Sequence, residues 1–197
     1  AFMLWNILGT SAAQIDMPDQ AIIALNKVIS LKPDFAEVYV NLAVVLKQQG
    51  MLDEAIEACN KAVLLKPDNT NAYYNMGNAL KDQGKLDEAL EAYNKAITLN
   101  PNHALAHNNI GNALKDQGKI EASIEAYNKA ISIDNKNSYA YFNAGLLLEN
   151  ANNKIKAASA TTIGTIILFL LIFFPDWINL LLRNFLFLLI SVYLINN

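Results

Sequence analysis

Two histidines, one cysteine and a recurring acidic pair are the side chains with the most evident chemistry. His103 and His107 lie four residues apart, a spacing that can place two metal ligands on one helix face. No third ligand lies near them in the sequence, and two histidines alone rarely make a site. The acidic residues of LDEA, at 52–55 and 86–89, precede apolar stripes, where negative charge favours the start of a helix. The single Cys59 excludes an intrachain disulfide and is interpreted as a small buried residue.

We therefore predict no catalytic residue, no metal site and no cofactor, and expect a protein that is not an enzyme. Nucleic acid is also an unexpected partner. The net charge of −3 and the interleaving of lysines with acidic residues leave no clustered basic surface for a phosphate backbone.

A different set of polar residues recurs along the chain at intervals of 34. These are Asn41, Asn75, Asn109 and Asn143. A primary amide offers one acceptor and two donors, so a row of amides could pair with the backbone of an extended peptide. The alternative is that asparagine is simply common at this position, or bonds within its own unit.

The elements that carry this column are set by an internal repeat. The nine residues GNALKDQGK occur at 77–85 and again at 111–119, and EAYNKAI occurs at 91–97 and at 125–131. In 70–103, apolar residues recur at helical spacing up to a glycine, and a second apolar stripe follows the glycine and ends at a proline. Each unit is therefore predicted to be two helices. The segment Asp34-Phe35-Ala36-Glu37 suggests a capping box at the start of one first helix.

This 34-residue pattern resembles the tetratricopeptide repeat, with an aromatic at position 4, small residues at 8, 20 and 27, and proline at 32. The departures are Asp16 in place of the turn glycine, Ser123 in place of a small alanine and Asn135 in place of the proline. The predicted array covers residues 1–153, in units 2–35, 36–69, 70–103 and 104–137 and a partial unit 138–153.

The resemblance implies an all-α fold, a right-handed α–α superhelix, that binds a protein or peptide along the concave groove lined by its first helices. The asparagine column is similar to the ladder in the repeat superhelix of O-linked N-acetylglucosamine transferase. Chaperone-binding members carry a carboxylate clamp of lysine and arginine at positions that hold Tyr74, Asn108, Tyr139 and Asn143 here, so such a clamp is not expected. The predicted groove residues are Asn41, Asn75, Asn78, Asn109, Asn112, Asn143, Tyr74, Asn108, Lys81 and Lys115.

The composition changes sharply after the array. From Ala157 onward the only charged residues are Asp176 and Arg183, and two apolar stretches flank Pro175. Each stretch is about 27 Å long as a helix, close to the hydrocarbon thickness of a bilayer. Residues 154–197 are therefore predicted to be a hydrophobic helical tail with one or two transmembrane helices, in which 157–195 would contact the membrane.

Lysines just before the tail would keep the repeats on the cytoplasmic side of that membrane. There are two alternatives for the tail: it could be a segment that caps the array, or the product of a frameshifted or truncated reading frame. In either case the protein would be cytoplasmic. The resulting hypothesis is a non-enzymatic scaffold with a possible membrane anchor. The alternative is the substrate-recruiting fragment of a larger enzyme, such as a glycosyltransferase that contains these repeats.

Overall fold

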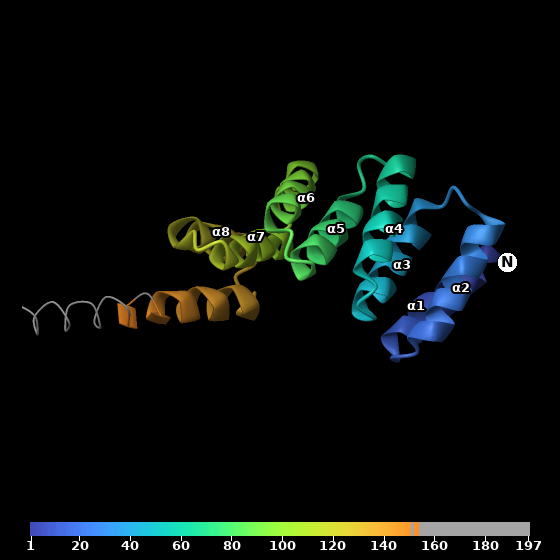
Figure 1. The fold of residues 1–197 in the computed structure, drawn as a ribbon, viewed down its shortest axis with the longest axis horizontal. Coiled ribbons are helices and arrows are strands. Elements are labelled where there is room, and N and C mark those ends of the chain that lie inside the picture. The colour runs from blue at the N-terminus through green and yellow to red at the C-terminus, as the bar shows by residue number, and fades with distance from the viewer. Residues whose placement is uncertain (151, 154–197) are drawn as a thin grey trace, which may run out of the picture. The chain divides into compact units, whose positions relative to one another are not determined.

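The computed structural model of the protein describes residues 1–150 and 152–153, and within these ranges the chain is helical and contains no strand (Figure 1). This agrees with the predicted all-α class. Residues 138–150 form the first helix of the fifth unit. The helices before it are α1 (Phe2–Gln14), α2 (Pro18–Leu31), α3 (Ala36–Gln48), α4 (Leu52–Leu65), α5 (Thr70–Asp82), α6 (Leu86–Leu99), α7 (Ala104–Asp116) and α8 (Ile120–Ile133).

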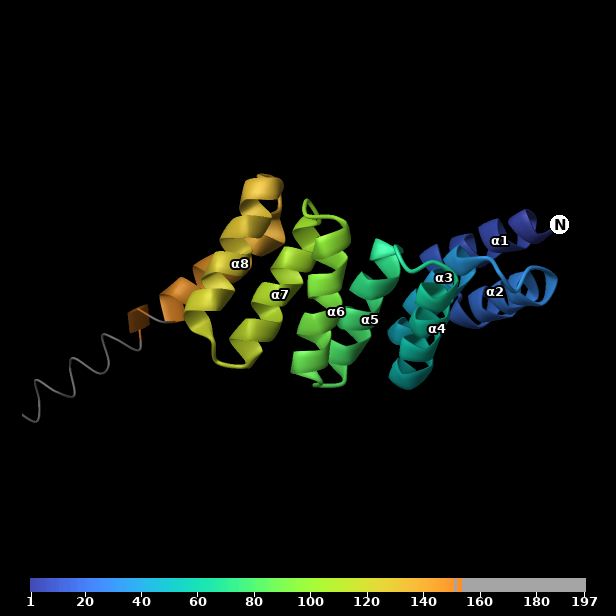
Figure 2. The same cartoon turned by 90° about the horizontal axis from the view of Figure 1, so that it is seen from above.

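The helices pack as consecutive pairs. α1 packs on α2, α3 on α4, α5 on α6 and α7 on α8, and the second helix of each pair then contacts the first helix of the next (Figures 1 and 2). The first helices α1, α3, α5 and α7 also contact one another in sequence, whereas α2, α4, α6 and α8 do not. The first helices therefore form a continuous inner row, as in a stacked solenoid.

Tight turns inside the pairs explain the glycine at the middle of each unit. Gly50, Gly84 and Gly118 have φ values of +74°, +79° and +77°, a left-handed conformation that a Cβ disfavours. Asp16 takes the same place between α1 and α2, with a φ of +58°. The residue that departs from the repeat pattern therefore adopts the backbone conformation of the glycines that it replaces.

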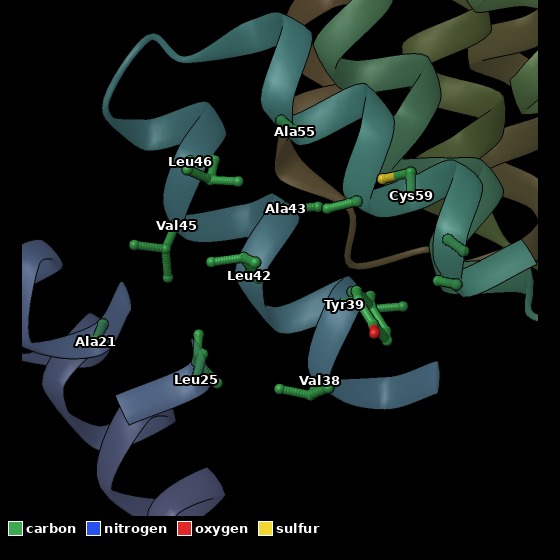
Figure 3. Packing of buried hydrophobic residues seen from close by; sticks show 14 of the residues in the cluster. Ala21, Leu25, Val38, Tyr39, Leu42, Ala43, Val45, Leu46, Ala55 and Cys59 are labelled. Carbon is green, nitrogen blue, oxygen red and sulfur yellow. The ribbon is translucent and has the colours of Figure 1, made fainter. Parts of the chain in front are cut away.

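The core runs along the stack and is richest in branched side chains around α3 (Figure 3). Val38 and Val45 are fully or almost fully buried, and Ala43 faces Cys59 of α4 across the pair. Later units bury smaller residues and tyrosines instead, such as Ala89, Tyr93 and Ala96 of α6. Burial of these apolar stripes against neighbouring helices is the main source of stability of such an array.

The predicted capping box is wrong. α3 begins at Ala36, its N-cap is Phe35, and no side chain caps it, because Asp34 lies one residue too early, in the preceding turn. In the third, fourth and fifth units the same column carries polar N-caps. The side chains of Asn69, His103 and Asn137 accept hydrogen bonds from the backbone N–H three residues later.

Two compact units divide the chain, Ala1–Leu147 and Leu148–Asn197. The predicted hydrophobic tail at 154–197 lies outside the described residues. Among the residues that are described, no helix is both long and apolar enough to cross a bilayer.

Candidate functional site

Most polar residues of the repeated GNALKDQGK segment have a structural partner, and the partner of Asn78 is a buried tyrosine. Gly77 lies under the ring of Tyr93, so that a Cβ at position 77 would be 2.6 Å from the Cδ1 and Cε1 atoms of the ring. The Tyr93 hydroxyl donates to the Oδ1 atom of Asn78 at 2.8 Å. Burial, with smaller contributions from Tyr74 and Asp82, raises the pKa of Tyr93 well above its ordinary value.

The next unit repeats this arrangement one repeat further along the chain. A Cβ at Gly111 would be 2.5 Å from the Cε1 atom of Tyr127, and the Tyr127 hydroxyl donates to Asn112 at 2.8 Å. The Ser123 hydroxyl, fully buried where other units have alanine, donates to the Gly111 carbonyl oxygen at 2.7 Å. Asn78 and Asn112 therefore anchor a helix pair in addition to lining its surface.

Asn109 lies at the centre of a hydrogen-bonded network that joins the third and fourth units. Its Nδ2 atom donates to Asn78 at 2.7 Å and to the Tyr74 hydroxyl at 3.3 Å. Its Oδ1 atom accepts from Asn108 at 3.2 Å and from Asn112 at 3.4 Å. Five of the predicted groove residues of these units are therefore bonded to one another, and Asn108 among them is only 5% exposed.

Three of the four members of the asparagine column connect their unit to the one before it. Asn41 donates to Asn6 at 3.3 Å and Asn143 donates to Asn108 at 3.1 Å, and both partners lie 35 residues earlier, as Tyr74 does for Asn109. The residue 35 positions before Asn75 is Val40, whose side chain offers no acceptor. Asn75 is partly exposed and is the member of the column without a hydrogen-bond partner among the described side chains.

The lysines predicted in the groove form ion pairs on the same helices. Lys81 lies 3.1 Å from Asp82, which also pairs with Lys47 of the preceding first helix at 2.9 Å. Partial burial would raise the pKa of Asp82, but hydrogen bonds and charge from Lys47 and Lys81 outweigh it and hold the pKa below its ordinary value. Lys115 pairs more loosely with Asp116, at 3.8 Å.

The glutamines of the repeated segment bond across the unit junctions. Gln83 donates to Asp53 at 2.7 Å and Gln117 donates to Asp87 at 2.7 Å. The aspartates of LDEA therefore accept from the next unit in addition to lying at the start of a helix. Donor and acceptor are separated by less than one full repeat, so a search by the repeat period does not find these pairs.

A small hollow lies on the row of first helices, beside the first member of the asparagine column. It has a volume of about 220 Å³ and lies mainly between α1 and α3, where Thr10, Gln14, Asn41 and Gln48 line it with aliphatic side chains. These amides and the hydroxyl offer donors and acceptors to a bound main chain. The arrangement can recognise a polar ligand, and it brings together no acid–base pair.

The two histidines and the cysteine have structural contacts. His103 caps α7 and packs against the Tyr74 ring at a tilt of 34°, with ring centroids 4.7 Å apart, and His107 bonds the Pro101 carbonyl oxygen at 3.2 Å. Burial lowers the pKa of both imidazoles. Cys59 is fully buried, which raises the pKa of its thiol to about 12 and makes it a poor nucleophile. Among the described residues no three His, Cys, Asp or Glu side chains form a metal-binding group.

Comparison with known families agrees with the repeat pattern. A family model described as "TPR repeat" matches residues 45–84, 77–118 and 111–151. Two models described as "Tetratricopeptide repeat" match residues 24–57 and 4–35. The comparison with curated proteins gave no match.

Similar solved structures share the fold. One, described as "Crystal structure of MamA", is 30% identical, with a TM-score of 0.66 over 77% of this chain and 89% of that chain. A structure of pilF from Pseudomonas aeruginosa is 22% identical, with a TM-score of 0.71 over 80% and 72%. MamA from Desulfovibrio magneticus RS-1 is 20% identical, with a TM-score of 0.68 over 82% and 91%. At their lower identities, the last two are evidence for the fold alone.

Proposed function

Because this chain belongs to the tetratricopeptide repeat family, we propose that it is a scaffold that binds a protein or peptide segment along the face formed by its first helices. Repeat arrays of this kind present extended surfaces and generally act through protein–protein contacts. The observation that carries the proposal is the row of amide side chains along that face, of which Asn75 alone keeps its amide free within the described residues.

Asn75 is the side chain that a bound segment would engage at the lowest cost. Asn41, Asn109 and Asn143 would each have to give up or share a hydrogen bond to the preceding unit before they could pair with a ligand. Asn75 exchanges water for the ligand, so its two donors and one acceptor are free to pair with a main-chain amide. We therefore place the first contact at the junction of α3 and α5.

The test is peptide binding to the full chain and to three variants. Peptides selected from a displayed random library against the wild-type chain should bind the Asn75→Ala variant about tenfold more weakly, the effect of one lost hydrogen bond. Asn109→Ala should weaken binding and also lower the unfolding temperature, because Asn109 holds the network together. Asn94→Ala, which removes an exposed amide on α6, is the matched control and should change neither.

Equal affinity of the wild type and the Asn75→Ala variant would refute the role of Asn75. Selection of peptides that bind the second-helix face would refute the proposed surface as a whole. No contact of the described residues favours the alternative of a substrate-recruiting piece of a larger enzyme.

The membrane anchor is a separate proposal that rests on the sequence of residues 157–195. Their apolar length and the lysines before them support it. If it is correct, the expressed chain should sediment with membranes and resist carbonate extraction, with the repeats accessible from the cytoplasmic side. Recovery in the soluble fraction would contradict it.

A further inference from the structure

A second hollow lies between the two helices of the second unit, away from the asparagine column. It has a volume of about 620 Å³ and is called here the α3–α4 furrow. Tyr39, Leu42 and Leu46 of α3, together with Ala58 of α4, provide its apolar lining. All four of these lining residues are buried. The furrow stays open because successive second helices do not contact one another, so none of them covers this side of α3.

The furrow is a feature of the repeat, enlarged in one unit. A hollow of about 290 Å³ lies between α5 and α6, and its seven lining residues occupy seven of the nine lining positions of the α3–α4 furrow, shifted by 34. The larger furrow differs at its rim, where Leu64 is 74% exposed. The other units carry a hydroxyl residue in that column, which is Ser30, Thr98 or Ser132. An exposed leucine beside an apolar hollow is typical of an interaction site.

Charges along α4 give the furrow two distinct ends. Glu54 and Glu57 line the half beside Leu46, and Lys61 lines the half that carries Leu64. The carboxylates are exposed, and no cation of the described residues forms an ion pair with them. A partner would therefore bind more tightly if it placed a positive charge beside Glu54 and Glu57 and no positive charge beside Lys61.

We propose that the α3–α4 furrow binds an amphipathic helix of a partner protein. The lining spans ten residue steps of α4, from Glu54 to Leu64, which is about 15 Å or nearly three helical turns. A helix that lies in a groove of this length presents apolar side chains at i, i+4 and i+7. Lysine or arginine at one end of the partner helix faces Glu54 and Glu57, and its apolar residue at the other end packs on Leu64.

This surface is independent of the proposed peptide-binding face. No member of the asparagine column lines the furrow, and Asn41, on the same helix α3, lines the hollow on the row of first helices instead. A scaffold with both surfaces could hold two partners at once. Variants on one surface should leave binding at the other unchanged.

The experiment uses a fluorescent helical peptide with leucines at i, i+4 and i+7, lysines at one end and glutamate at the other. Its fluorescence anisotropy is titrated with the full chain. Leu64→Ser should weaken binding about tenfold, the effect of removing one buried leucine contact. The variant should remain folded, because Ser30 and Ser132 occupy the same column. Glu54→Gln with Glu57→Gln should weaken binding most at low salt.

Two controls make the result specific. Glu88→Gln with Glu91→Gln, the matched pair in the α5–α6 hollow, should leave binding unchanged. A peptide with its lysines and glutamate exchanged should bind more weakly than the first. The proposal is overturned if the peptide does not bind, if both peptides bind equally, or if Asn75→Ala abolishes binding while Leu64→Ser has no effect.

Discussion

Replacement of Gly77 by alanine tests whether the contact between Gly77 and Tyr93 sets the distance between the two helices of a pair. The added methyl group would lie 2.6 Å from two carbon atoms of the Tyr93 ring, about 1 Å inside an ordinary carbon–carbon contact. The ring cannot easily move away, because it is fully buried and its hydroxyl is bonded to Asn78. Either the ring leaves its position or α5 moves away from α6.

The expected cost follows from two opposing effects. Overpacking of a close-packed site costs about 1–3 kcal/mol, whereas alanine in place of glycine inside a helix gains about 1 kcal/mol. We expect Gly77→Ala to lower the free energy of unfolding by up to about 2 kcal/mol. The second unit has alanine and a smaller partner at the same two positions, since Ala43 faces Cys59 there, so the contact is made without a clash.

A double-mutant cycle separates the clash from other effects. Tyr93→Cys alone should be strongly destabilising, by about 3–5 kcal/mol, because a large buried ring is lost. In that background Gly77→Ala should become stabilising by up to about 1 kcal/mol, which gives a coupling energy of about 2 kcal/mol. Urea unfolding followed by far-ultraviolet circular dichroism measures all four free energies.

The control is Gly84→Ala, where φ is +79° and no atom lies within 4 Å of the added Cβ. Its cost of about 1–2 kcal/mol is conformational and should not depend on residue 93. If Gly77→Ala costs the same with tyrosine and with cysteine at position 93, the steric explanation is refuted.

Three further predictions concern residues that depart from the repeat or report on its folding. Burial lowers the pKa of His103 below 6.5, so its contribution to stability is present above pH 6.5 and is lost as the pH falls through the folded-state pKa. Replacement of His103 by asparagine, the residue of the neighbouring units, should therefore reduce the drop in unfolding temperature between pH 8 and about pH 5. An unchanged drop would contradict this assignment. The Cys59 thiol, whose pKa burial raises to about 12, should react with a disulfide reagent only as fast as the array opens, so rapid labelling of the native chain would argue against its burial. Asp16→Gly should raise the free energy of unfolding by up to about 1 kcal/mol, because φ is +58° there, and a loss of stability on urea unfolding would count against that reasoning.

The sequence predicts the helix pairs well because their determinants are local. Apolar spacing, a turn glycine and a helix-ending proline recur from one repeat to the next, and the described helices begin and end at these signals. The predicted capping box was wrong because Asp34 lies one residue before the N-cap position, which Phe35 occupies. The repeat column through Asn69, His103 and Asn137 would have selected the correct position.

The partners of the polar residues could not be read from the repeat period. Asn109 reaches back to Tyr74, slightly further than one repeat, and Gln117 reaches back to Asp87, slightly less than one repeat. These offsets depend on how one pair is rotated against the next, and a sequence period carries no information on that rotation. The bond between Tyr93 and Asn78 joins two helices of one unit, over a separation that is also not a multiple of the repeat period.

The contacts between units are themselves periodic, and this affects how the gene can change. Residues 70–103 meet their neighbours through Tyr74, Gln83 and Asp87, and a tandem copy of this segment would present the same side chains at the new junction. In such a longer chain, the copy of Asn75 would face Tyr74 in place of Val40. The amide of the copy would therefore be hydrogen-bonded to the preceding unit, whereas the amide of the original Asn75 would remain available to a ligand. Gain or loss of a whole unit would therefore change ligand binding while the contacts between units are kept.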